Sequence, residues 1–415
     1  MNELAAYSTV AITLGLIVTR PSLGLSFRLT PAMSAFAGVA FLFALGIVTP
    51  EHWVRAATNL WTPFVAIGSI MVMTEVARRI GLLERGASFI DTQATSTGRL
   101  FLFVFVLGVV TSTSFNNDAA ILLLTPLVVT LIKRRYPGHP EMALPFAFAV
   151  FMSAGVAALP VSNPMNMVVA EFLKISFNDY ARHMIPVAVA GWLIAFLVLR
   201  AIFASPLTTP IGPAPENARR STKVQYLMIA LLACVLASYP IFGSLGHPVW
   251  AVAAAGALLS LVLAWRCQGA NPLRVARDGV SWGTLAFLLA VLVMSQGLQE
   301  VGLVGRLAAL YENAGLATIG MTSSIGSALL NNHPMSYLNM LALQTTSADN
   351  ISVFAALVGG DLGPRLLPMG SLAGLLWLEM LRRHGVDVSV GRFVRVGLLV
   401  AVPTIAVSLA ILSLY

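Results

Sequence analysis

Two adjacent asparagine pairs, Asn116-Asn117 and Asn331-Asn332, interrupt apolar stretches of the chain. Each asparagine side chain offers one carbonyl acceptor and two N–H donors. Such groups can satisfy a backbone turn and still bind a neutral solute that carries hydroxyl groups. The simpler alternative is that the asparagines only cap the helices that follow them. Because the pairs occupy matching places in two halves of the chain, we favour substrate binding by all four residues.

Two further apolar stretches are broken by proline and small polar residues. Ser162 and Asn163 precede Pro164, which favours the first position of a half-helix, and Gly370 and Ser371 begin a second one. The N-terminus of a helix directs free N–H groups and positive partial charge toward a ligand. The alternative is a proline kink whose polar neighbours satisfy the freed backbone groups. We expect these four polar and glycine positions to complete a four-part site with the asparagine pairs.

Ionisable residues in the same stretches are the candidates for proton coupling: Asp118, His333, Asp361 and Arg365. Asp118 could instead complement the dipole at a helix start. Asp361 and Arg365 are four residues apart and could form a structural ion pair if the chain there is helical. Arg365 stays protonated, so it can act only as a counter-charge. His333 titrates near neutrality, although a single histidine in a turn is more often a satisfied hydrogen-bonding group.

The composition shows which elements must hold these residues. The 415 residues are 58% hydrophobic and 10% charged, whereas a soluble domain is about a quarter charged. Long apolar runs predict membrane-spanning helices of about 20 residues each. The formal charge of +8 does not indicate nucleic-acid binding, because the basic residues lie in short loops between apolar runs. Two cysteines and no recurring nucleophile or ligand cluster argue against an enzyme, a metal site or a cofactor.

The apolar segments predict an all-α polytopic membrane protein. Four short segments form two re-entrant helical hairpins, about 100–132 and 317–346, with turns at 111–118 and 331–334. Two spans, about 143–174 and 350–383, are broken transmembrane helices. The ordinary spans are expected at about 5–19, 32–49, 61–77, 184–204, 224–242, 248–265, 280–297 and 393–414.

Lys and Arg residues give the expected orientation. With both ends of the first hairpin on one side, 20 of the 25 basic residues fall on that side. Cytoplasmic loops carry an excess of Lys and Arg, so this side is expected to face the cytoplasm of a cell inner (plasma) membrane, with both termini outside. The second hairpin, which has no basic residue at either end, is expected to enter from outside. The residues on the basic side are Arg20, Arg28, Arg78, Arg79, Arg85, Arg99, Lys133, Arg134, Arg135, Arg200, Arg219, Arg220, Lys223, Arg266, Arg274, Arg277, Arg382, Arg383, Arg392 and Arg395.

An internal repeat divides the chain. Trp61 and Trp282 are 221 residues apart, as are Gly81 and Gly302, and the asparagine pairs follow at an offset of 215. The order of features is the same in both halves, and the charge pattern predicts opposite orientations. Inverted-topology repeats with broken helices are typical of secondary transporters, which bind substrate near the bilayer midplane. The expected divisions are N-terminal helices 1–50, first repeat 51–204, cytoplasmic linker 205–223, intervening helices 224–265 and second repeat 266–415.

At these residues the chain resembles the arsenite and antimonite efflux permeases, the ArsB family of the ion transporter superfamily. The resemblance covers essentially the whole chain. His333 departs from the family pattern, in which an apolar residue, usually leucine, is expected. The matching stretches are 114–120 with the following Leu-Leu-Leu-Thr-Pro, 161–166, 330–334 and 360–365 running to 370–372, of which the last is the most specific to the arsenite branch.

The resemblance implies export of trivalent arsenite and antimonite from the cytoplasm, by proton antiport or with a separate ATPase subunit on the cytoplasmic side. Alternating access would follow an elevator or a rocking movement. Arsenous acid is a neutral trihydroxide, which amide, hydroxyl and backbone groups can hold loosely and release. The alternatives are a sodium- or proton-coupled carrier of a small organic anion, a sodium–proton antiporter of the same superfamily, and a channel-like pore.

Overall fold

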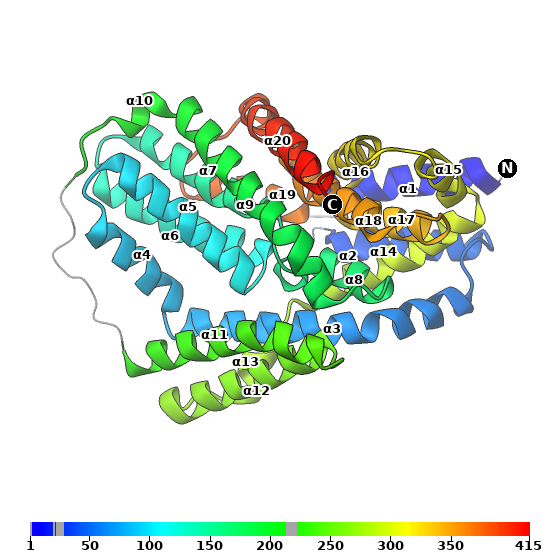
Figure 1. The fold of residues 1–415 in the computed structure, drawn as a ribbon, viewed down its shortest axis with the longest axis horizontal. Helices are drawn as coiled ribbons and strands as arrows, with labels where there is room; N and C mark the ends of the chain where they lie inside the picture. The colour runs from blue at the N-terminus through cyan, green and yellow to red at the C-terminus, as the bar shows by residue number, and fades with distance from the viewer. Residues whose placement is uncertain (1, 20, 22–28, 213–221) are drawn as a thin grey trace.

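The computed structural model of the chain describes residues 2–19, 21, 29–212 and 222–415, and within these ranges all regular structure is helical. The all-α class is therefore confirmed for the described residues (Figure 1). Arg20, Arg28, Arg219 and Arg220, which contributed to the charge pattern, lie outside the described residues.

The ordinary spans lie where the apolar runs predicted them. In the described part of the chain, seven helices are long and apolar enough to cross a membrane. They include α3, which begins at Pro50 rather than near Trp61, because Thr49 and His52 form a capping box there. The seven are α3 (Pro50–Arg79), α5 (Thr97–Ser114), α9 (Phe177–Ile202), α11 (Lys223–Ser244), α12 (Val249–Gln268), α14 (Trp282–Glu300) and α20 (Val390–Leu412). The first two predicted spans correspond to α1 (Asn2–Thr19) and α2 (Pro31–Ala44), whose apolar stretches are shorter.

Both predicted hairpins are present, with tighter turns than expected. The first joins α5 (Thr97–Ser114) to α6 (Asn117–Arg135), and the second joins α16 (Leu316–Leu330) to α17 (Asn332–Gln344). Only two residues separate the first pair of helices and one separates the second. The chain reverses quickly because an asparagine caps the second helix at once. Pro334 fits inside the first turn of α17, where its missing N–H needs no partner.

Both predicted broken spans are also present. The first consists of α7 (Ala143–Ser153), the short helix η2 (Pro160–Ser162) and α8 (Pro164–Phe172). The second consists of α18 (Asn350–Leu362), η3 (Gly363–Arg365), η4 (Pro368–Gly370) and α19 (Leu372–Arg383). Asn163 caps α8 and Ser371 caps α19, so each half-helix begins where the sequence predicted.

Five short helices were not predicted, and two of them strengthen the repeat. Gly81 and Gly302, which are equivalent in the repeat, adopt φ values of 71° and 82° and begin short helices. The order long helix, short helix, hairpin, broken helix and final span therefore occurs twice. The opposite orientation of the two halves stays a prediction. The short helices are α4 (Leu82–Gln93), η1 (Pro140–Met142), α10 (Ala204–Leu207), α13 (Pro272–Gly279) and α15 (Leu303–Tyr311).

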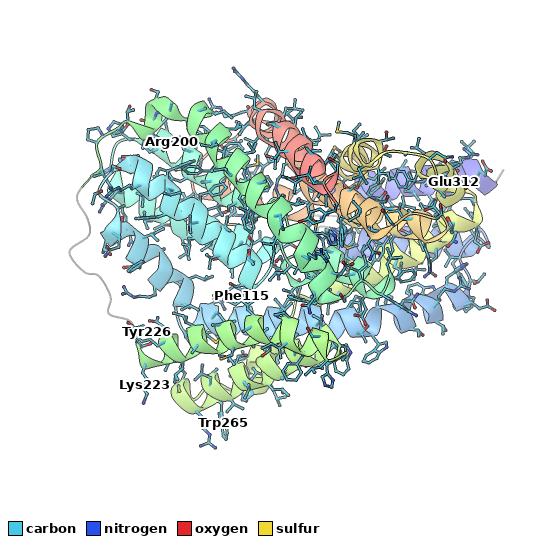
Figure 2. All side chains as sticks on the ribbon, in the orientation of Figure 1. Phe115, Arg200, Lys223, Tyr226, Trp265 and Glu312 are labelled. Carbon is cyan, nitrogen blue, oxygen red and sulfur yellow. The ribbon has the colours of Figure 1, made fainter. Side chains whose placement is uncertain are left out.

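The loops gather at two ends of the molecule in the grouping that the charge pattern predicted. At one end, Arg79 pairs with Asp278 at 3.1 Å, and Lys133 donates a hydrogen bond to the carbonyl of His384. At the other end, Arg306 pairs with Glu3 at 2.9 Å, and Asn350 donates to Asp179. Figure 2 shows Arg200 and Lys223 toward the first end and Glu312 at the second. The first end is hereafter the basic end.

Candidate functional site

The first hairpin tip lies inside the molecule, where its asparagines hold the turn. The Asn116 side chain accepts a hydrogen bond from the Ala119 amide at 2.7 Å, and Asn117 accepts one from the Asp118 amide at 2.8 Å. Figure 2 shows Phe115, at the tip of this hairpin, between the two ends of the molecule. The capping alternative is therefore confirmed for Asn116. Its side chain also lines a cavity, so capping and exposure to a solute coexist.

This cavity, which we call the central cavity, has a volume of about 450 Å³. It lies between the first hairpin tip, the last turns of α3, the start of α14 and the start of α19. Its walls combine apolar side chains with hydroxyl, amide and charged groups, a combination typical of small-molecule sites. The polar lining side chains are Thr30, Thr74, Glu75, Arg78, Asn116, Asp118, Ser281 and Thr284.

Asp118 is the carboxylate of the first hairpin that faces the central cavity. Among the described residues, its carboxylate has no hydrogen-bonding or ion-pair partner within contact distance, although the Arg365 charge acts on it from farther away. A carboxylate in this position can bind and release a proton or a solute hydroxyl without first breaking another bond. Its location at a helix start fits the dipole alternative equally well.

Glu75 and Arg78 form a second charged group in the central cavity, which the sequence reading missed as a site. Arg78 makes two hydrogen bonds of 2.7 Å to the Glu75 carboxylate, and Arg79 adds a third of 2.5 Å. Arg79 also reaches Asp278 of α13, so the network joins α3 to the second half of the chain. The spacing of a glutamate three and four residues before two arginines could have revealed these pairs.

Asp361 lies at the end of α18 and accepts hydrogen bonds from the first broken helix. The Asn163 amide donates to one oxygen at 2.6 Å, while the Asn166 amide and the Ala157 backbone donate to the other at 3.0 Å. Tyr180 extends this network, since it accepts from Asn166 at 2.8 Å and donates to the Ala157 carbonyl at 3.1 Å. All of these groups are buried. The cluster therefore satisfies a buried carboxylate with amides and ties together the breaks of the two halves.

Arg365 does not make the direct ion pair with Asp361 that their spacing allowed. Among the described residues, no contact of 4 Å or less joins their charged atoms, because the α-helix ends at Leu362 and the chain continues as the short helix η3 from Gly363 to Arg365. Arg365 instead donates to the Ala154 carbonyl at 2.5 Å and lies 4.4 Å from the centre of the Phe151 ring. Arg365 thus closes the end of α7 and acts on Asp361 and Asp118 only as a more distant counter-charge.

The second hairpin tip differs from the first in its backbone. Asn331 has φ 79° and ψ 147°, a region that glycine tolerates and other residues rarely adopt. Its side chain accepts from the His333 amide at 3.3 Å and donates to the Met369 carbonyl at 3.4 Å. The His333 ring lies 3.1 Å from the same asparagine oxygen and packs against Phe287, which lines the central cavity. Within the described chain, the side-chain oxygen of Asn332 is buried without a hydrogen-bond partner.

Each hairpin tip lies against the break of its own half. Ser162 donates to the Thr113 carbonyl at 3.4 Å, as Asn331 does to Met369 in the second half. A Cβ atom on Gly370 would approach Pro364 Cα to 2.7 Å, so Gly370 permits close packing rather than offering a ligand group. Of the eight residues predicted to bind substrate, Asn116 alone is among the residues that line the central cavity. The seven that do not line it are Asn117, Ser162, Asn163, Asn331, Asn332, Gly370 and Ser371.

Comparison with known proteins decides the family. The model of a family described as the arsenical pump membrane protein matches residues 6–415. The chain belongs to the arsenical pump membrane protein family. The Escherichia coli K12 arsenical pump membrane protein is 29% identical over 99% of this chain and 98% of its own length. A putative arsenical pump membrane protein of Bacillus subtilis is 23% identical over 92% of this chain and 94% of its own length.

Membership of the arsenical pump membrane protein family establishes a multi-pass membrane transporter linked to arsenical resistance. A solved structure of similar fold is the Alcanivorax borkumensis YdaH transporter, described as having an unusual topology. It matches with a TM-score of 0.62 and 17% identity, and the match covers 100% of this chain and 98% of that one. At this identity the likeness concerns the fold alone.

Proposed function

We propose that this member of the arsenical pump membrane protein family exports arsenite and antimonite, as neutral trihydroxides, from the cytoplasm in exchange for protons. The family assignment supports an arsenical as the substrate. The central cavity supports a small polyhydroxy solute, because it presents carboxylate, amide and hydroxyl groups on a mainly apolar wall. The fold lies in an inner membrane, with the basic end at the cytoplasm and both termini outside.

The observation that carries the proposal is the position of Asp118. It faces the central cavity beside Asn116, and among the described residues its carboxylate makes no close polar contact. A proton arriving from outside on Asp118 would neutralise the carboxylate and release the solute, and the return to the charged state would prepare the next cycle. The Asp361 carboxylate already accepts hydrogen bonds from three N–H groups, so it is better suited to fixing the geometry of the broken helices than to exchanging protons.

The position of the central cavity supports entry of the solute from the basic end. It includes the end of α3, the residues around Gly279 between α13 and α14, and the segment before α2, all of which lie toward that end. Alternating access then carries the hairpin tips from this arrangement to one that faces outside, by an elevator or rocking movement.

Uptake of radiolabelled arsenite into everted vesicles or proteoliposomes under an imposed pH gradient tests the proposal. We expect uptake that requires the gradient, and Asp118→Asn is expected to abolish gradient-driven uptake while the protein remains folded. Asp387→Asn, an exposed change of the same charge, is the matched control. Gradient-driven uptake by Asp118→Asn at the unmodified rate would refute the proton role. Uptake that requires ATP and a separate cytoplasmic ATPase subunit would indicate an ATP-driven pump in place of proton antiport.

A small organic anion is the second candidate substrate, and Arg78 in the central cavity is the observation that favours it. Arg78 is already bonded to Glu75 through both carboxylate oxygens, and Asp118 adds a second negative group to the cavity. The balance of charge therefore favours a neutral solute. Dicarboxylates that inhibit arsenite uptake competitively would reverse this ranking.

A further inference from the structure

A second cavity of about 500 Å³ lies away from the site, between α7, α10 and α20 near the basic end. We call it the lateral groove. Arg392 and Arg395, in the first turns of α20, line it together with the apolar side chains of Phe203, Val396 and Leu399. Phe203 packs on Phe148 at 5.9 Å between ring centres, so part of the wall is held by the aromatic core.

The two arginines of the lateral groove are available for a ligand. Both are exposed, and within the described residues neither guanidinium has a hydrogen bond or an ion pair. Their spacing of three residues places them on one face of α20. Most other arginines toward the basic end are engaged: Arg78 and Arg79 with Glu75, and Arg382 and Arg383 with Glu379. The groove therefore carries positive charge that the protein does not neutralise.

One carboxylate opposes this charge. Glu141 lines the lateral groove and lies 3.0 Å from the His139 ring. Hydrogen bonds from its own backbone amide and from His139 lower the pKa of Glu141, so it is ionised at neutral pH. The two arginines outnumber it, which leaves a net positive groove.

The surroundings of the lateral groove are those of a membrane boundary. Helices α9 and α20 pack side by side and lead away from the basic end (Figure 1). Exposed apolar side chains continue along both helices, at Val189, Leu193 and Leu197 of α9 and at Leu398 and Val402 of α20. A molecule in the groove would thus meet arginines at one end and an apolar surface at the other.

We propose that the lateral groove binds an anionic phospholipid, with its phosphate between Arg392 and Arg395 and its acyl chains along α9 and α20. Basic pockets between helices at the cytoplasmic membrane boundary suit such headgroups. Arginine forms directed pairs with phosphate oxygens. The volume is that of a small-molecule site. A bound lipid would join α7 to α20 without touching the central cavity.

Native mass spectrometry of the full-length protein with phosphatidylglycerol tests the proposal, with phosphatidylcholine as the zwitterionic comparison. Each arginine near an anionic headgroup contributes about fivefold in affinity. We expect Arg392→Gln with Arg395→Gln to weaken phosphatidylglycerol binding by about 25-fold. Glu141→Gln should strengthen it. The matched control is Arg266→Gln with Arg274→Gln, which removes the same charge from exposed positions that do not line the groove.

Equal loss of phosphatidylglycerol binding in the two double variants would overturn the proposal, because the effect would then be one of overall charge. Glycerol 3-phosphate that displaces phosphatidylglycerol at equal concentration would also overturn it, since the site would then bind any phosphate. Thermal unfolding without added lipid should be the same for both double variants, because all four arginines are exposed.

Discussion

The carboxylate of Asp361 and the side-chain amide of Asn163, 198 residues apart in the chain, are joined by a hydrogen bond of 2.6 Å in the protein interior. This bond connects the end of α18 to the cap of α8, and hence the broken helix of one half to that of the other. Buried polar groups stay stable only when they are paired. The Asp361 cluster therefore holds the two broken helices in one relative position, because only that position pairs the buried carboxylate with its three donors.

Replacing Asp361 with asparagine should destabilise the protein. All three groups that face the carboxylate are N–H donors, so the new NH₂ group would oppose a donor in either orientation. An unsatisfied buried polar group costs about 1–3 kcal/mol. Thermal unfolding of the purified protein should show a lower midpoint, whereas the exposed Asp387→Asn should not. An unchanged midpoint for Asp361→Asn would mean that the carboxylate is not held as described.

The strained backbone at Asn331 predicts an unusual preference for glycine. Glycine at this position relieves a conformational cost of about 1–3 kcal/mol. Losing the side-chain cap to glycine costs only about a few tenths of a kcal/mol in stability. Asn331→Gly should therefore be at least as stable as the unmodified protein, and Asn331→Ala should be less stable. At Asn116, where φ is −173° and any residue fits, glycine and alanine should differ by less. Denaturation midpoints for the four variants measure the contrast, and equal glycine–alanine differences at the two tips would contradict it.

Two glycines of α20 offer a matched pair for testing how tightly Arg365 is held. A Cβ atom at Gly397 would overlap the backbone carbonyl oxygen of Arg365, whereas Gly391 has open space around it. Forcing extra volume into a packed interior costs about 1–3 kcal/mol. We expect Gly397→Ala to lower the unfolding midpoint and reduce arsenite transport. Gly391→Ala should leave both unchanged, and equal behaviour of the two variants would show that α20 does not constrain Arg365.

From the positions of the two cysteines we expect transport that uses no thiol ligand. Cys234 and Cys267 are exposed on α11 and α12, and neither lines the central cavity. Replacing both with serine should leave gradient-driven arsenite uptake within about twofold of the rate of the unmodified protein, since neither cysteine lines the central cavity. Loss of uptake in this double variant, with the protein folded and in the membrane, would place a thiol in the mechanism.

The sequence predicted the helical elements well because their signals are local. A stretch of about 20 apolar residues specifies a span by itself, and Asn163, Pro164 and Ser371 mark half-helix starts by their own capping chemistry. The turns were predicted too long, since Thr111 and its polar neighbours look like loop residues. In the structure Thr111 and Ser112 are buried within α5.

The partners of Asp361 could not be predicted, because they come from the distant chain. Ala157 contributes a backbone N–H, which no residue type announces, and Tyr180 reaches the cluster from α9. The spacing of Asp361 and Arg365 suggested a local pair, but the break at Gly363 removed the helical geometry that such a pair requires. Repeat symmetry located the tips, whereas packing between the halves decided which side chains face the central cavity.

The volume of the central cavity has a consequence for selectivity. Water occupies about 30 Å³ per molecule in the liquid, so a space of about 450 Å³ holds on the order of 15 waters. A small trihydroxide entering it would remain largely hydrated and would be one polar molecule among many. Shape alone cannot sort solutes in such a vestibule. If the central cavity binds the solute as we propose, discrimination would come where the hydration shell is removed, and Asn116 and Asp118, which line the cavity, would replace that shell.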